Sequence, residues 1–219
     1  MRNDEAVWLA VGVGAVLVMR GGGPEWGGGW VWPVPTLVLP DAQYPAVVSD
    51  GFGPGKRDGG KRAHAGVDVM FKRRTLVDQV VPYPPGTRLG STRFFAPTGT
   101  PILAARDARV WSVKKTSRGI AVVLDHGKPW ATFYTHLAST ALDEHEDGKR
   151  IERAGLVGRR RTDPQLVMAG EVIGTMGHDP TGNAPTHLHF ECWYKGAGSD
   201  AAVDPEKAMA RWRRQEWQP

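Results

Sequence analysis

The sequence predicts a mainly β protein built from antiparallel strands joined by tight turns. The first indication is the 28 glycines and 17 prolines among 219 residues, which divide the chain at turn-like intervals. The second is that the segments between them are short and rich in apolar and β-branched residues, as at positions 102–105, 108–113, 120–125 and 132–136. A chain of this length suits one domain with a core of ordinary size.

Two further elements can be placed near the C-terminus. Residues 188–194, with the sequence LHFECWY, are rich in aromatic side chains and are expected to form a strand. Asp204 can cap a helix and Pro205 suits its first position, so we expect a short C-terminal helix over residues 206–217. The remaining elements are expected to be strands.

The N-terminal segment, residues 1–20, differs from the rest of the chain. Residues 6–19 form an uncharged, mostly apolar run, which as a helix would be roughly 21 Å long and shorter than the ~30 Å hydrocarbon core of a bilayer. Because the leading residues are not net basic, a secretory signal, an anchor and a docking helix all stay open. We expect the Gly- and Trp-rich residues 21–32 to be a flexible linker and residues 33–219 to be the folded domain.

The residues with the clearest chemistry form two short clusters, HAGVD at positions 64–68 and HLH at positions 187–189. Side chains alternate between the two faces of a strand, so His64 and Asp68 share a face, as do His187 and His189. Imidazole nitrogen and carboxylate oxygen bind Zn²⁺ readily, and a catalytic zinc has three protein ligands and one open position. The two clusters together predict a zinc site.

These clusters and several other segments resemble the lysostaphin/LytM-like family of zinc endopeptidases, which cut peptidoglycan peptides. The segments occur in the family's order and extend over most of the chain. They are KRAHAGVDV (61–69), APTGTPILAA (96–105), GIAVVLDHG (119–127), TFYTHLAS (132–139), AGEVIG (169–174) and TGNAPTHLHFE (181–191). The resemblance implies a compact antiparallel β-sheet sandwich or barrel-like core with a groove that holds the zinc.

The resemblance also implies a role for each residue of the site. His64, Asp68 and His189 correspond to the three zinc ligands. His187 corresponds to the general acid/base that takes a proton from the metal-bound water, and His136 to a second histidine that orients His187 or the substrate. His136 would also stabilise charge on the tetrahedral intermediate.

One catalytic helper of the family has no counterpart at its usual place. Family members often carry a tyrosine a few residues before the first ligand, but residues 49–63 contain none. Tyr134 lies two residues before His136 and would share its strand face, so it is the substitute candidate.

Two stretches, near residues 70–95 and 140–165, are longer than a minimal domain of this family needs. Both carry clustered cations, such as Arg159 to Arg161 in the second. Long loops on a compact scaffold are often functional, so these two either wall a substrate groove or are inert, solvated loops.

Other residues with reactive side chains lack the spacing of a site. His126, His145 and His178 are expected to lie at the surface. Cys192 is three residues after His189, so it should face away from the ligands as a small buried hydrophobic residue. A single cysteine excludes an internal disulfide.

The net charge of +5 and the pI near 9.5 favour an anionic partner. The basic residues are scattered and no nucleic-acid module is visible, and a bacterial wall would satisfy the charge equally well. Charge alone does not identify the partner, and it is the family resemblance that implies peptidoglycan. We therefore predict a zinc endopeptidase acting on peptidoglycan cross-links or stem peptides, outside the cytoplasm, either in the cell envelope or in a phage tail or related injection machine. Membrane or assembly contacts would involve residues 6–19. The alternatives are a non-catalytic member of the fold that binds wall or a protein partner, and a domain that zinc only stabilises.

Overall fold

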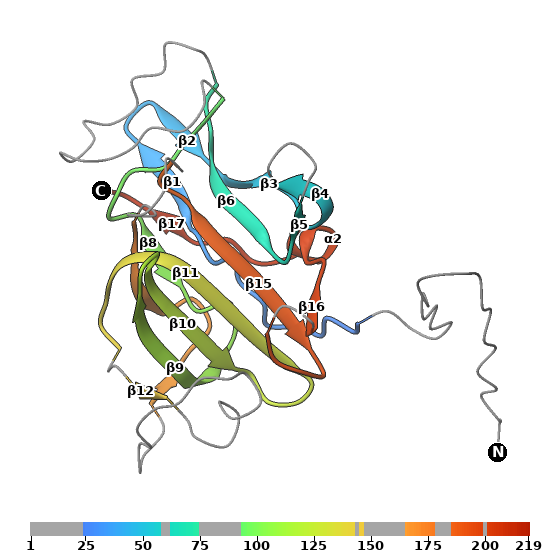
Figure 1. Ribbon diagram of the computed structural model, residues 1–219. Coiled ribbons are helices and arrows are strands. Elements are labelled where there is room, and N and C mark those ends of the chain that lie inside the picture. Colours follow the sequence, from blue (N-terminus) through green and yellow to red (C-terminus); the bar gives the residue numbers. More distant parts are fainter. Residues whose placement is uncertain are drawn as a thin grey trace, which may run out of the picture.

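The computed structural model describes residues 24–57, 62–74, 93–142, 145–146, 165–177, 185–198 and 201–219. Within these ranges the chain consists mostly of strands, with one short α-helix (Figure 1). The mainly β prediction is therefore confirmed, although the sheets stay open and do not close into a barrel.

The main sheet has twelve strands, all of them paired in antiparallel fashion. Its central path runs through β12 (His145–Glu146), β9 (Ala108–Thr116), β10 (Gly119–Asp125), β11 (Trp130–Thr140), β15 (Leu188–Tyr194), β6 (Val67–Lys72) and β3 (Ala46–Asp50). The other five strands are β7 (Phe94–Phe95), β8 (Pro101–Leu103), β13 (Leu166–Val167), β14 (Val172–Met176) and β16 (Ala202–Val203). The long strands β11 and β15 lie side by side across the middle of the molecule (Figure 1).

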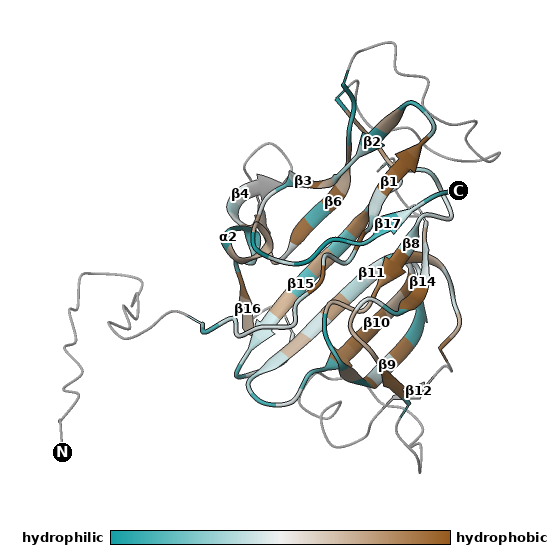
Figure 2. Cartoon of the chain, turned by 180° about the vertical axis from the view of Figure 1, so that it is seen from behind, coloured by the Kyte–Doolittle hydropathy of each residue, from teal (hydrophilic) through white to brown (hydrophobic). Residues whose placement is uncertain are grey.

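Two small sheets complete the fold. One contains β17 (Glu216–Trp217), β1 (Thr36–Leu39) and β2 (Ala42–Tyr44), and the other pairs β4 (Gly53–Arg57) with β5 (Arg62–His64). Figure 2, seen from the side opposite to Figure 1, shows β1 and β17 on the near side of the main sheet. The β4–β5 hairpin lies beside β6 (Figure 1), and His64 is its last residue.

The core lies on one face of β15. Leu188, Phe190 and Cys192 are fully buried there and belong to the main hydrophobic cluster, together with Tyr134 of β11. This alternation follows from the twofold period of a strand. The strand predicted over residues 188–194 is confirmed with those bounds, and Cys192 is buried away from the ligand face, as expected.

The C-terminal helix is shorter than predicted. Helix α2 (Glu206–Met209) begins where expected, and its Glu206 N–H donates to Asp204 Oδ1 at 2.9 Å. The helix does not continue to residue 217, because residues 216–217 form β17 and pair in parallel with β1. Tertiary pairing overrides the local helix preference of this segment.

The segment before residue 33 also packs on the domain. Trp30, Val31 and Trp32 are buried within the range predicted to be a linker. The Trp30 ring stacks on Trp212 with centroids 4.8 Å apart, and the Trp32 indole N–H donates to the Met209 carbonyl oxygen at 2.7 Å. The packed core therefore extends N-terminally to Trp30. Residues 1–23, with the apolar run 6–19, and most of the two predicted insertions lie outside the described residues.

Candidate metal and catalytic site

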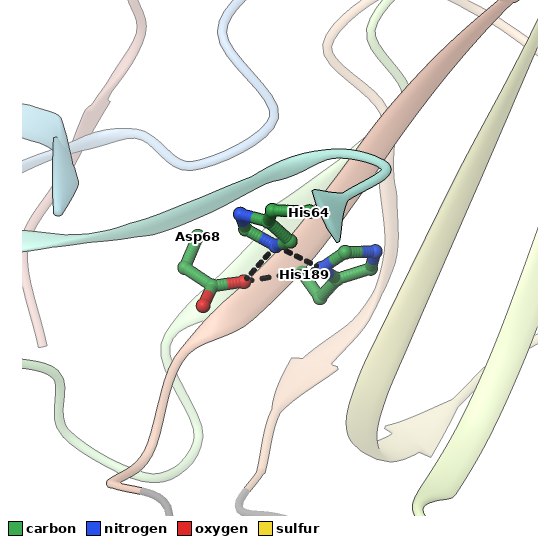
Figure 3. Close-up of side chains that lie close together, drawn as sticks. All are labelled: His64, Asp68 and His189. Carbon is green, nitrogen blue, oxygen red and sulfur yellow. Dashed lines mark hydrogen bonds and ion pairs between the residues drawn. The ribbon is translucent and has the colours of Figure 1, made fainter. Parts of the chain in front are cut away.

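Three elements bring the predicted ligands together. His64 ends β5, Asp68 is the second residue of β6, and His189 is the second residue of β15. Asp68 and His189 are directly opposite one another in the antiparallel β6–β15 pair. Figure 3 shows the three side chains pointing toward a common centre.

The three donor atoms form a compact triangle. His64 Nε2 lies 2.9 Å from His189 Nδ1, and Asp68 Oδ1 lies 3.2 Å and 3.1 Å from those two nitrogens (Figure 3). A tetrahedral zinc with ligands near 2.0 Å would separate its donors by about 3.3 Å. The triangle is a few tenths of an ångström tighter than this, so small outward shifts would fit the ion.

Hydrogen bonds on the outer side of each imidazole direct its lone pair inward. The His64 Nδ1–H donates to the Gly51 carbonyl oxygen at 2.8 Å, and the His189 Nε2–H donates to Glu191 Oε1 at 2.9 Å. Two imidazole lone pairs and a carboxylate oxygen then converge on one point, which is an arrangement suited to a divalent cation. The donor set thus fits zinc.

Glycine at position 66 lets the first two ligands approach β15. A Cβ on Gly66 would collide with the Phe190 carbonyl oxygen and would lie 2.8 Å from Glu191 Cγ and 3.0 Å from His189 Cε1. Residues 65–66 form a bend between β5 and β6, so the ligands His64 and Asp68 come from two strands. The sequence pattern predicted a single strand here.

The electrostatics of the cluster are dominated by burial and by the carboxylates. Burial disfavours the charged imidazole of His189, but hydrogen bonds to Asp68 and Glu191 outweigh it, so the pKa of His189 is raised from its usual 6.5. These same carboxylates would favour a bound cation.

Two further histidines lie beside the ligands. The rings of His136 and His187 have centroids 4.6 Å apart, and His187 Nε2 lies 3.6 Å from Asp68 Oδ1. The His187 Nδ1–H donates to the Pro185 carbonyl oxygen at 2.7 Å, while Nε2 is buried and has no hydrogen-bond partner among the described residues. The His136 Nδ1–H donates to the Arg118 carbonyl oxygen at 3.0 Å. The structure therefore brings together all five histidine and aspartate residues predicted for the site.

Tyr134 is not at the site. It is fully buried on the core face, where its ring packs 5.2 Å from Phe190 and its oxygen accepts the Ala105 N–H at 2.8 Å. The predicted alternation fails because His136 has a φ of 70° at a register shift in β11, which turns His136 away from the face of Tyr134. Burial also raises the pKa of the Tyr134 phenol far above its usual value. The structure thus excludes Tyr134 as the catalytic helper.

One other histidine differs from its prediction. His126 is only partly exposed, and its Nδ1–H donates to the Asp107 carbonyl oxygen at 3.0 Å, while its Nε2 lies 2.7 Å from Thr132 Oγ1. Burial lowers the pKa of His126 from 6.5 to about 4. His178 and the side chain of His145 lie outside the described residues.

The sequence reasoning missed the groups that hold the imidazoles. Glu191 could have been found, because it lies two residues after His189 and so shares its face of β15. The carbonyl oxygens of Gly51, Pro185 and Arg118 carry no side-chain signal, and only the fold places them.

Part of the chain matches a known peptidase family. Residues 89–166 match the model of peptidase family M23. The cell division protein DipM of Caulobacter vibrioides is 30% identical over 130 residues, which are 58% of this chain and 18% of DipM. This chain therefore spans less than a fifth of that relative's length.

Solved structures share the fold at low sequence identity. LytU matches with a TM-score of 0.50 and 19% identity, over 75% of this chain and 84% of the other. A chain of the SpoIIQ–SpoIIIAH pore-forming complex matches with a TM-score of 0.51 and 15% identity, over 83% of this chain and 90% of the other. Among the described residues, the structure has no helix long and apolar enough to cross a membrane.

The family model and the shared fold agree with the motifs read from the sequence. The matched range contains His136, and the three predicted metal ligands lie on either side of it. The resemblance to the lysostaphin/LytM-like family is thus confirmed, and the middle of the chain matches peptidase family M23.

Proposed function

We propose that this chain is a zinc-dependent endopeptidase that hydrolyses peptide bonds in peptidoglycan cross-links or stem peptides. The observation that carries the proposal is the buried His187 Nε2, which has no hydrogen-bond partner among the described residues and lies beside the triangle of donor atoms. Leaving such an atom unpaired in the interior is costly, so a water or a substrate group is the partner we assign to it.

Each side chain of the site has a separate role in the proposed reaction. His64 Nε2, Asp68 Oδ1 and His189 Nδ1 would hold the zinc. A zinc bound there would supply a Lewis acid and would lower the pKa of a bound water. The His187 Nδ1–H is held by the Pro185 carbonyl, so Nε2 carries the lone pair that accepts a proton from that water and returns it to the leaving amine.

His136 is the remaining candidate for stabilising the oxyanion. Its ring faces that of His187, and its Nδ1 is fixed by the Arg118 carbonyl. With Tyr134 in the core, we assign His136 to the oxygen of the substrate carbonyl or of the tetrahedral intermediate. It would bind this oxygen as an imidazolium, which has a second N–H, on Nε2, to donate.

The substrate assignment is supported by the family resemblance and by charge. A chain with a net charge of +5 is attracted to a polymer that carries peptide carboxylates, and this attraction weakens with salt. The same activity suits a wall-remodelling enzyme outside the cytoplasm and a wall-piercing part of a phage tail.

The test is hydrolysis of purified peptidoglycan by the full chain loaded with zinc. We expect new amino groups to appear, and we expect a chelator to prevent this and added zinc to restore it. If the wall stays intact and the protein still sediments with it, the chain is a non-catalytic wall-binding protein. If chelation unfolds the protein and His187→Ala changes no property, the zinc has a structural role only.

A further inference from the structure

We propose that Glu191 and Trp193 are positioning residues for the metal site, in which Trp193 holds the Glu191 carboxylate and this carboxylate holds His189. The inference rests on the proposed zinc site, and it adds two residues that set how tightly the metal is bound. It follows from a continuous chain of contacts along one face of β15.

Both oxygens of the Glu191 carboxylate are engaged, each by a different donor. Oε1 accepts the His189 Nε2–H at 2.9 Å, and Oε2 accepts the Trp193 Nε1–H at 2.7 Å. Glu191 is 5% exposed, and a buried carboxylate is costly unless it is hydrogen-bonded. These two bonds therefore fix the carboxylate as well as satisfying it.

The strand places the three residues in line. Residues 189, 191 and 193 are separated by two positions each, so they follow one another on the face of β15 that is opposite the main core. Trp193 is held in turn by Phe133 of β11, with ring centroids 5.6 Å apart and an interplanar angle of 12°. Phe133 is paired with Glu191 across the two strands. The position of the carboxylate thus depends on β15, which carries Glu191 and Trp193, and on β11, which carries Phe133.

These hydrogen bonds select the tautomer of the His189 imidazole that can bind a metal. Because Glu191 accepts the proton on Nε2, the lone pair is on Nδ1, which faces His64 and Asp68. A carboxylate that accepts from the outer nitrogen of a metal-bound imidazole makes that imidazole a stronger ligand, and losing it typically weakens metal binding by 10- to 100-fold.

The test measures zinc affinity, by competition with a chelator, and the absorption spectrum of the Co²⁺-substituted protein. Glu191→Gln keeps the shape but has only one oxygen for two donors, so we expect zinc affinity to fall by about 10- to 100-fold. Trp193→Phe keeps the stacked ring and removes one donor, so we expect a loss of up to about tenfold. Trp111→Phe is the matched control, because Trp111 belongs to the same buried aromatic cluster, and it should stay within about twofold of the wild type.

The double variant separates positioning from packing. If Trp193 acts through Glu191, adding Trp193→Phe to Glu191→Gln should cause little further loss. Wild-type zinc affinity and an unchanged Co²⁺ spectrum in Glu191→Gln would overturn the inference. Equal losses of zinc affinity in Trp193→Phe and Trp111→Phe would also overturn it. So would a wild-type chain that binds no zinc. Peptidoglycan hydrolysis is measured separately, so a protein that binds zinc through this relay but leaves the wall intact contradicts only the proposed function.

Discussion

The two faces of strand β15 are buried to a similar degree but are held in different ways. On one face, Leu188, Phe190 and Cys192 pack among other apolar side chains of the main core. On the other face, His189 and Glu191 are 8% and 5% exposed, and each polar group has a named hydrogen-bond partner. Burial therefore does not distinguish core from site in this strand.

This difference determines what a substitution on each face should change. Apolar packing is non-directional, so damage to it lowers the free energy of unfolding. Hydrogen-bonded polar groups fix the orientation of one another, so damage to them should alter metal binding and catalysis more than folding.

The largest effect is expected at Asp68, which is predicted to be a metal ligand. Asp68 Oδ1 is within 3.2 Å of both ligand nitrogens, so Asp68→Ala should abolish stoichiometric zinc binding. Activity should fall by a factor on the order of 10³ or more, since the zinc contributes several kcal/mol to catalysis. Metal analysis and a wall-hydrolysis assay measure the two losses. Retention of one bound zinc per chain would show that Asp68 is not a ligand.

A pair of phenylalanines compares the two faces directly. Phe190→Ala on the core face should lower the free energy of unfolding by about 3–5 kcal/mol, because it leaves a cavity in the main cluster. Phe133→Ala on the site face should cost less, since Phe133 is only partly buried. Urea unfolding of the two zinc-free variants gives both values. Equal costs would mean that the two faces contribute alike to stability.

The free energy of unfolding should depend on pH because of His126. The ring of this histidine contacts Thr132 and Trp30. Its pKa is about 4 in the folded chain and 6.5 in the unfolded chain, so between these values the unfolded state binds more protons. The free energy of unfolding should therefore have its full value above pH 6.5. It should fall by up to roughly 3 kcal/mol as the pH drops to 4. Unfolding measured across this range should show a flatter profile for His126→Gln. An identical profile for both proteins would remove His126 as the cause.

The smallest effect is expected at Gly66, where the β5–β6 bend meets β15. A methyl group there has no room against the Phe190 carbonyl, so Gly66→Ala should displace the bend at a cost of about 1–3 kcal/mol. Zinc affinity should fall as well, because the same displacement separates His64 from His189. Gly53→Ala, in the adjacent hairpin, is the control for backbone strain. A Cβ on Gly53 would meet nothing within 4 Å, but the φ of 111° is unfavourable for alanine. A Gly66→Ala chain with normal zinc affinity would contradict the need for close approach.

The parts of the fold that the sequence predicts are those with a strong local period. The alternation in residues 188–194 is enough to assign the strand, to bury Cys192 and to place His187 and His189 together. The convergence of His64 and Asp68 on His189 was inferred from their residue types and from the family resemblance, and the pairing of β6 with β15 accounts for it.

The parts that were not predicted depend on contacts distant in sequence. Tyr134 was misplaced because the positive φ of His136 interrupts the strand period, and nothing in the local sequence marks that change. The helix was predicted too long because Trp212 stacks on Trp30 and β17 pairs with β1, and both contacts join the C-terminal segment to the start of the domain. The same contacts bury Trp30 and Trp32 within the range expected to be a linker.

His187, which immediately precedes β15, and His189, the second residue of β15, are assigned different roles. The most direct measurement is the zinc content and wall-hydrolysis rate of His187→Ala and His189→Ala, compared with the wild type. We expect His187→Ala to keep one zinc per chain and lose activity by about 10²- to 10⁴-fold, since we assign the buried Nε2 of His187 as the proton acceptor. His189→Ala should lose both zinc and activity. Loss of zinc in His187→Ala, or hydrolysis at the wild-type rate, would contradict this division of roles.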